Sequence, residues 1–210
     1  CLLIKQEVPF IDSLPPIESS DQLLHRSCEE IGIRAICSLL TTQVACEFLQ
    51  QGSLSEALPF FHNKLSQFKV EKCLTPQERK IFSGSFSEQD AIDAAWRYES
   101  YWVLLWTLGI VDDLSYPSTI CDCNFAIQAV SRHKDRKSFL ASAKLHSLDR
   151  IMDMADLTYR YDWACVDARI HGKDAPAGLD SGVVMERHKA FSWLLGFSGK
   201  DDWDVPEINT

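Results

Sequence analysis

The sequence contains no stretch in which apolar and polar residues alternate over the length of a β-strand, and it contains no internal repeat or low-complexity tract. These absences argue against a sheet-based fold and against a repeat fold. Long apolar runs are also missing. The longest uncharged one, Tyr101–Val111, is about half of the ~20 residues that a bilayer-spanning helix needs. We therefore expect a helix of the protein core here, and no membrane partner.

Basic residues are in the minority. The 210 residues include 21 Lys and Arg against 30 Asp and Glu, which gives a formal charge of −9. Such a field repels nucleic-acid backbones and favours basic or neutral partners, so we expect no nucleic-acid partner. The one basic cluster, residues 132–137, is interrupted by Asp135 and is interpreted as a solvated turn.

Several catalytic signatures are absent. The sequence has no His-Glu-x-x-His, no Glu-x-x-His, no Gly-x-Ser-x-Gly and no Walker phosphate loop, which argues against the enzyme classes that depend on them. The eight cysteines are scattered, and Cys121 and Cys123 form the only close pair, without a second pair nearby. We therefore expect no metal site and no cofactor, and we expect free thiols in a reducing compartment, the cytoplasm. No secretory signal is recognised at the start of the sequence either.

What the sequence does contain is helical periodicity. It predicts an all-α fold, a compact single-domain bundle of seven or eight helices. Residues 1–20 are predicted as an extended lead-in, because two consecutive prolines cannot lie within a helix, and residues 21–210 as a single helical domain with an irregular tail. Ser20 or Asp21 is predicted to cap the first long helix and Ser87 the central one. Thr75, followed by Pro76 and Glu78, is typical of a capping box.

A long helix predicted between Ser147 and His171 carries two polar stripes instead of one. At ~100° per residue, Thr158, Asp162 and Arg169 fall on the side opposite to a larger set. Since a surface helix needs only one solvated stripe, one stripe should face protein, a ligand or a cleft. The larger set consists of Asp149, Asp153, Asp156, Arg160, Trp163, Asp167 and His171.

Five segments of the sequence resemble the successive blocks of a mostly bacterial family catalogued as domain of unknown function 4272. They are residues 26–35, 96–109, 151–172, 178–195 and 202–210. The family name brings no established reaction. Matched position by position, the resemblance points to Arg26, Glu30, Arg34, Trp96, Arg97, Glu99, Trp106, Asp153, Asp156, Arg160, Trp163, Glu186, Arg187, His188 and Trp193. The sequence departs from the family pattern at Ser192 and Asn209, where the family often has Asn and Asp.

Charged residues on these helices form what we name the candidate polar cluster. Glu99 shares a helix face with tryptophans, and a carboxylate in such surroundings must be paired, protonated or functional. Arg97, Arg160 and Arg187 suit it as counter-ions, because their planar forks bind carboxylates with two parallel hydrogen bonds. The candidate polar cluster consists of Arg97, Glu99, Asp153, Asp156, Arg160, Glu186, Arg187 and His188.

Three functions are compatible with these residues. The sequence favours a soluble acidic domain that binds an unknown protein, for which a basic surface would be complementary, with the cluster as an internal structural network. In the second, the acidic members of the cluster hold Mg²⁺ or Mn²⁺ in a metal-assisted hydrolase or phosphate-transfer enzyme, with His188 or His171 as acid or base. The third is a small-molecule binding module on the tryptophan-rich central helix, with Glu99 or Arg97 at the base of the pocket. Its ligand-lining candidates are Trp96, Trp106, Trp163 and Trp193.

Overall fold

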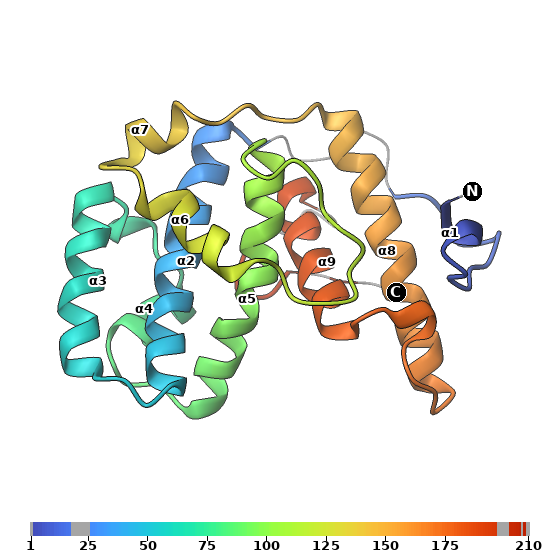
Figure 1. The fold of residues 1–210 in the computed structure, drawn as a ribbon, viewed down its shortest axis with the longest axis horizontal. Coiled ribbons are helices and arrows are strands. Elements are labelled where there is room, and N and C mark those ends of the chain that lie inside the picture. The colour runs from blue at the N-terminus through green and yellow to red at the C-terminus, as the bar shows by residue number, and fades with distance from the viewer. Residues whose placement is uncertain (1, 18–25, 197–201, 207, 209–210) are drawn as a thin grey trace.

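The computed structural model describes residues 2–17, 26–196, 202–206 and 208. In these ranges the chain forms nine α-helices and no β-strand (Figure 1). Seven of the helices have seven residues or more, so the predicted all-α bundle is confirmed. The helices are α1 (Leu2–Lys5), α2 (Cys28–Leu49), α3 (Leu54–Phe68), α4 (Pro76–Phe82), α5 (Glu88–Thr107), α6 (Cys123–Ser131), α7 (Arg136–Leu140), α8 (Leu148–Ile170) and α9 (Ser181–Leu195).

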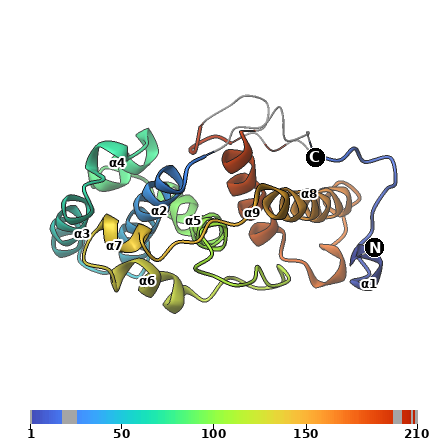
Figure 2. The ribbon, with the colours of Figure 1, turned by 90° about the horizontal axis from the view of Figure 1, so that it is seen from above.

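Five long helices lie side by side in the order α3, α2, α5, α9 and α8 (Figures 1 and 2). Helix α4 packs on one face of this row, whereas α6 and α7 pack on the other (Figure 2). Helix α1 lies at the outer side of α8 (Figure 1). The central position of α5 explains why all its residues from Glu99 to Thr107 are buried, as the apolar run in this part of the sequence predicts.

Two clusters of apolar side chains hold the row together. The larger includes Trp106, Phe191 and Phe139, which are completely buried. The smaller joins Leu3 and Val8 of the N-terminal segment to α8 and α9. Because burial of one large apolar side chain contributes about 1.5–3 kcal/mol, these clusters account for most of the attraction between the helices.

The predicted capping residues stand where the sequence indicated, except at the first long helix. The side chain of Thr75 accepts a hydrogen bond from the Glu78 N–H, and Ser87 caps α5 in the same way. Helix α2 begins at Cys28, where Ser27 is the N-cap in a reciprocal capping box. The predicted caps Ser20 and Asp21 lie outside the described residues, and the prediction placed the start of this helix too early.

The predicted lead-in differs from the structure in one respect. Residues 14–17 are not helical, as the two prolines require, but Leu2–Lys5 forms the short helix α1. Leu3, which is 3% exposed, packs in the smaller apolar cluster with Tyr161 of α8. Burial of this side chain gives a reason for the local helix, which the proline pattern alone does not reveal.

Helix α2 is long and apolar enough to cross a membrane by length and composition. Within the structure, 72% of its most apolar window is buried. Core helices of folded domains pass the same test, so this property of α2 is weak evidence for a membrane span.

Candidate functional site

Three consecutive residues of α9, Glu186, Arg187 and His188, are each at most 3% exposed and each bind a different partner. Arg187 donates from Nε to Glu99 Oε2 on α5 at 3.0 Å, and the other oxygen of Glu99 accepts the backbone N–H of Cys121. Arg187 also donates from Nη1 to the carbonyl of Ser115 at 2.7 Å. Glu99 is thus a paired carboxylate, and Arg187 joins α5, α9 and the connection after α5.

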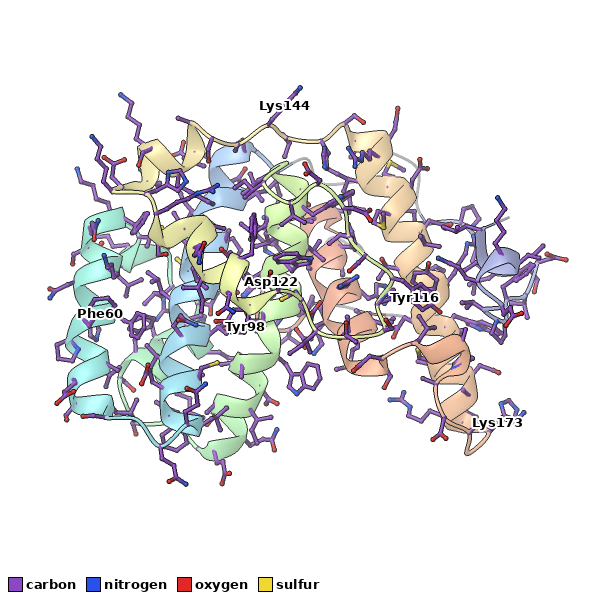
Figure 3. All side chains as sticks on the ribbon, viewed as in Figure 1. Phe60, Tyr98, Tyr116, Asp122, Lys144 and Lys173 are labelled. Carbon is purple, nitrogen blue, oxygen red and sulfur yellow. The ribbon has the colours of Figure 1, made fainter. Side chains whose placement is uncertain are left out.

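The connection after α5 is also fixed on its outer side. Tyr116, labelled in Figure 3, lies in this connection beside α8, and its ring packs edge-on against Tyr161 at a centroid distance of 5.7 Å. The connection therefore forms part of the packed structure around the Glu99–Arg187 pair.

Glu186 is the second buried carboxylate of the candidate polar cluster. Its Oε2 accepts a hydrogen bond from Ser100 Oγ at 2.8 Å, and its Oε1 accepts one from Lys189 Nζ at 2.6 Å. The Arg97 guanidinium lies 3.9 Å from the same carboxylate. Glu186 is therefore positioned by two hydrogen bonds and has two cations close by.

His188 binds a residue of the shorter polar stripe of α8. From α8, the candidate polar cluster includes residues of the larger stripe only. His188 Nδ1 lies 2.9 Å from Asp162 Oδ2, and both side chains are almost completely buried. Thr158 and Asp162 of the shorter stripe face the protein, whereas Arg169 of the same stripe is exposed. Two of the three residues predicted on this face are thus buried.

The remaining members of the candidate polar cluster lie apart from α9. Asp156 and Arg160 form an ion pair within α8, with 2.8 Å between Nε and Oδ2, and Asp153 is exposed. The candidate polar cluster is therefore divided into separate ion pairs and does not form one continuous network. Within the described ranges, no three His, Cys, Asp or Glu side chains come together in a group that could hold a metal ion, so the geometry lends no support to the carboxylate set of the hydrolase hypothesis.

The four tryptophans predicted to line a ligand site have different surroundings. Trp106 is completely buried in the core, Trp163 is half-buried on α8, and Trp193 packs edge-on against Trp203 at 5.1 Å. Trp96 is 39% exposed, and its ring lies directly over Gly182 at the start of α9. Of the four, Trp96 lines the cavity described next.

A cavity of about 470 Å³ opens between α2, α4, α5, α9 and the C-terminal segment, and we name it the Arg97 cavity. Its buried lining residues form the base and its exposed ones the mouth. The base consists of Ser38, Thr41, Thr42, Glu78, Ile81, Glu186 and Trp203, and the remaining lining residues are Gln77, Lys80, Asp90, Asp93, Ala94, Trp96, Arg97, Gly182, Met185, Lys189 and Asp204.

Three lining residues each have a buried polar atom without a hydrogen-bond partner among the described residues. They are Ser38 Oγ, Glu78 Oε1 and Arg97 Nη1. A buried donor or acceptor that lacks a partner costs about 1–3 kcal/mol. Three residues that line one cavity thus carry hydrogen-bonding capacity that the fold itself does not use.

Glu78 and Arg97 are held in place by their other atoms. Glu78 Oε2 binds the Arg34 guanidinium and accepts the Thr75 N–H. Arg97 Nη2 donates to the carbonyl of Asp204 at 3.1 Å. Burial raises the pKa of the Glu78 carboxyl above its ordinary value, although the Arg34 charge opposes this shift.

Trp203 completes the base of the cavity. Its ring, 4% exposed, lies 5.4 Å from the guanidinium carbons of both Arg34 and Arg97. The capping box predicts Glu78 only as a capping residue and gives no connection between Glu78 and Arg34. The signal in the sequence is a glutamate at the third position of a short helix whose opposite side is apolar. This position is compatible with a buried carboxylate, but it does not identify the residue that pairs with it.

A family model described as domain of unknown function (DUF4272) matches residues 2–206. A search of the curated proteins and a search of the solved structures each returned no match.

Proposed function

Because the chain belongs to the family described as domain of unknown function (DUF4272), a description that names no reaction, we propose a function from the geometry: this protein is a binding module for a small polar molecule, which occupies the Arg97 cavity. The observation that carries the proposal is that three residues lining this cavity, Ser38, Glu78 and Arg97, each have a buried polar atom without a hydrogen-bond partner among the described residues. A ligand would supply their missing hydrogen bonds.

The form of the cavity supports this proposal. Its volume of about 470 Å³ lies within the ~300–1,000 Å³ that is usual for small-molecule sites. Its wall includes apolar side chains, such as Ile81 and Met185, as well as polar ones, and small-molecule sites commonly combine an apolar surface with a few oriented polar groups. The pocket hypothesis drawn from the central helix has Glu99 or Arg97 at the base of the pocket, whereas Arg97 lies nearer to the mouth of this cavity and Glu99 is not among its lining residues.

Protein binding through the acidic surface stays a second proposal, which rests on composition alone. We also propose a cytoplasmic location, with support from the cysteines. The seven described cysteines are free thiols, and burial raises the pKa of both Cys46 and Cys165 to about 11. Such protonated thiols suit a reducing compartment and a structural role.

Ligand-observed NMR of the full chain with a library of small polar fragments tests the binding function. Ala94→Phe places a ring in the cavity, and Arg97→Met removes one of the three unpartnered groups. We expect both variants to lose the fragments that the unmodified chain binds. Ala95→Phe is the matched control, because Ala95 is half-buried on the same helix but does not line the cavity.

Circular dichroism must show that each variant keeps its helix content. If a folded Ala94→Phe protein retains all fragment binding, or if no fragment binds the unmodified chain, the Arg97 cavity is not a ligand site and the proposal is wrong.

A further inference from the structure

The charges around the Arg97 cavity are of both signs and mostly pair with each other. Lys80 binds Asp90 at 2.7 Å, and Lys189 binds Glu186 at 2.6 Å. These internal pairs leave one acceptor and one donor with unused capacity at the charged groups of the wall. The acceptor is Glu78 Oε1, and the donor is Arg97 Nη1, which makes no hydrogen bond although Glu186 Oε2 lies 3.9 Å away. A ligand that complements both atoms therefore offers a hydrogen-bond donor to Glu78 and a hydrogen-bond acceptor to Arg97.

The charge balance narrows the class of ligand further. Five carboxylates line the cavity against three cations, with Arg34 immediately behind as a fourth. A phosphate or another strong anion would meet carboxylates on several sides, and like charges in a site of low dielectric are unfavourable. A ligand with only a positive charge would leave Arg97 Nη1 without a hydrogen bond, which has its own cost.

Resting on the proposed function, we infer that the ligand of the Arg97 cavity is a zwitterion of the amino-acid class, with its ammonium group at Glu78 and its carboxylate at Arg97. The Ser38 hydroxyl at the base is a further hydrogen-bond partner. The rings of Trp96 and Trp203 and the side chain of Met185 line the space that remains for an uncharged substituent.

The two charged contacts have unequal environments. Glu78 is 4% exposed and bound to Arg34, so it is held in one orientation. The side chain of Arg97 is 15% exposed and lies nearer to the mouth. The ammonium group would thus enter first and lie deepest, and the carboxylate would close the site. A charge-assisted hydrogen bond that is lost from such a site corresponds to a weakening of about 10- to 100-fold.

The test uses isothermal titration calorimetry with the full chain. Each of the twenty proteinogenic L-amino acids is titrated separately, and the tightest binder is compared with its N-acetyl derivative and its amide, which lack the ammonium group and the carboxylate respectively. We expect at least one amino acid to bind and both derivatives to bind at least tenfold more weakly. Arg97→Met should weaken binding of the amino acid at least tenfold, whereas Lys72→Met, an exposed position outside the cavity, should not.

The remaining outcomes overturn the inference. If the N-acetyl derivative or the amide binds as tightly as the parent amino acid, the zwitterion is not the recognised form. If no amino acid binds, the inference is wrong, and the fragment experiment then decides separately whether the cavity binds another small molecule. Unchanged helix content by circular dichroism is required for Arg97→Met. The derivative comparison in the unmodified chain does not depend on any variant.

Discussion

The guanidinium of Arg187 on α9 donates a 3.0 Å hydrogen bond to the carboxylate of Glu99 on α5, and neither side chain is more than 4% exposed. A buried ion pair of this kind contributes little net stability by itself, because removing two charges from water is costly. Loss of one partner is a different matter, since it leaves the other charge buried and uncompensated. The pair therefore makes the docking of α5 on α9 depend on both residues being present.

We expect Glu99→Gln to lower the free energy of unfolding by about 3–5 kcal/mol, because Arg187 then keeps an uncompensated buried charge. The double variant Glu99→Gln with Arg187→Met should lose clearly less than the sum of the two single losses. Urea unfolding followed by circular dichroism measures all three. The control is Asp156→Asn, which breaks a partly exposed pair within α8 and should cost about 0.5 kcal/mol or less. A Glu99→Gln loss as small as that of Asp156→Asn would contradict the argument.

A second prediction concerns the start of α4. Thr75→Ala removes the hydroxyl that accepts the Glu78 N–H at 3.2 Å, and we expect a loss of about 1 kcal/mol, within the ~0.5–2 kcal/mol usual for such caps. Ser53 offers a matched control, because it precedes α3 but makes no capping hydrogen bond with its side chain. Ser53→Ala should therefore change the unfolding midpoint in urea very little. Equal losses in the two variants would show that the Thr75 cap is not what stabilises α4.

The sequence was sufficient for features that depend on neighbours along the chain. The caps at Thr75 and Ser87 follow from residues three positions apart, and the buried part of α5 follows from a continuous apolar run. The predicted start of α2 is too early because Ser20 and Asp21 are residue types that commonly cap helices, as is Ser27, the N-cap in the structure. Ser27 has a glutamate three residues later that completes a capping box, and this local signal was available.

The partners of the charged residues could not be predicted in the same way. Helical periodicity places Glu99 on a face of α5, but Arg97, Arg160 and Arg187 were equally acceptable as counter-ions. The choice of Arg187 depends on how α9 lies against α5. Likewise Arg34 and Glu78, 44 positions apart, meet because α4 packs on α2. Such pairings follow from the relative placement of helices, which no single helix pattern contains.

Gly182 gives a way to change the Arg97 cavity without removing a charge. A Cβ atom at this position would lie 2.8 Å from the ring of Trp96, so Gly182→Ala must displace that ring. Since the ring is 39% exposed, it has room to move, and the helix propensity of alanine exceeds that of glycine by up to ~1 kcal/mol. We therefore expect the melting temperature to stay the same or rise.

Ligand binding should respond differently to Gly182→Ala. We expect the affinity for the amino acid identified by calorimetry to change at least threefold, a shift of about 0.7 kcal/mol, because the wall of the cavity is altered. Ser181→Ala, at the neighbouring exposed position outside the cavity lining, should leave it unchanged. If both variants bind the amino acid as the unmodified chain does, Trp96 is not part of the binding wall.

The pKa of Glu78 predicts how binding depends on pH. Burial raises this pKa above the ordinary value of 4.5, and the nearby carboxylate of Asp204 adds to the shift, whereas Arg34 and the Thr75 N–H oppose it. Below the raised pKa the carboxyl is neutral and attracts an ammonium group less strongly. Affinity for the amino acid should therefore fall as the pH is lowered through this raised pKa, because the carboxyl then loses its negative charge. In Glu78→Gln the affinity should be weaker and its fall with acidification should disappear, provided that circular dichroism shows the chain to be folded at each pH. An identical pH profile in Glu78→Gln would assign the titration to another group and remove Glu78 from the site, because a side chain that cannot ionise cannot produce it.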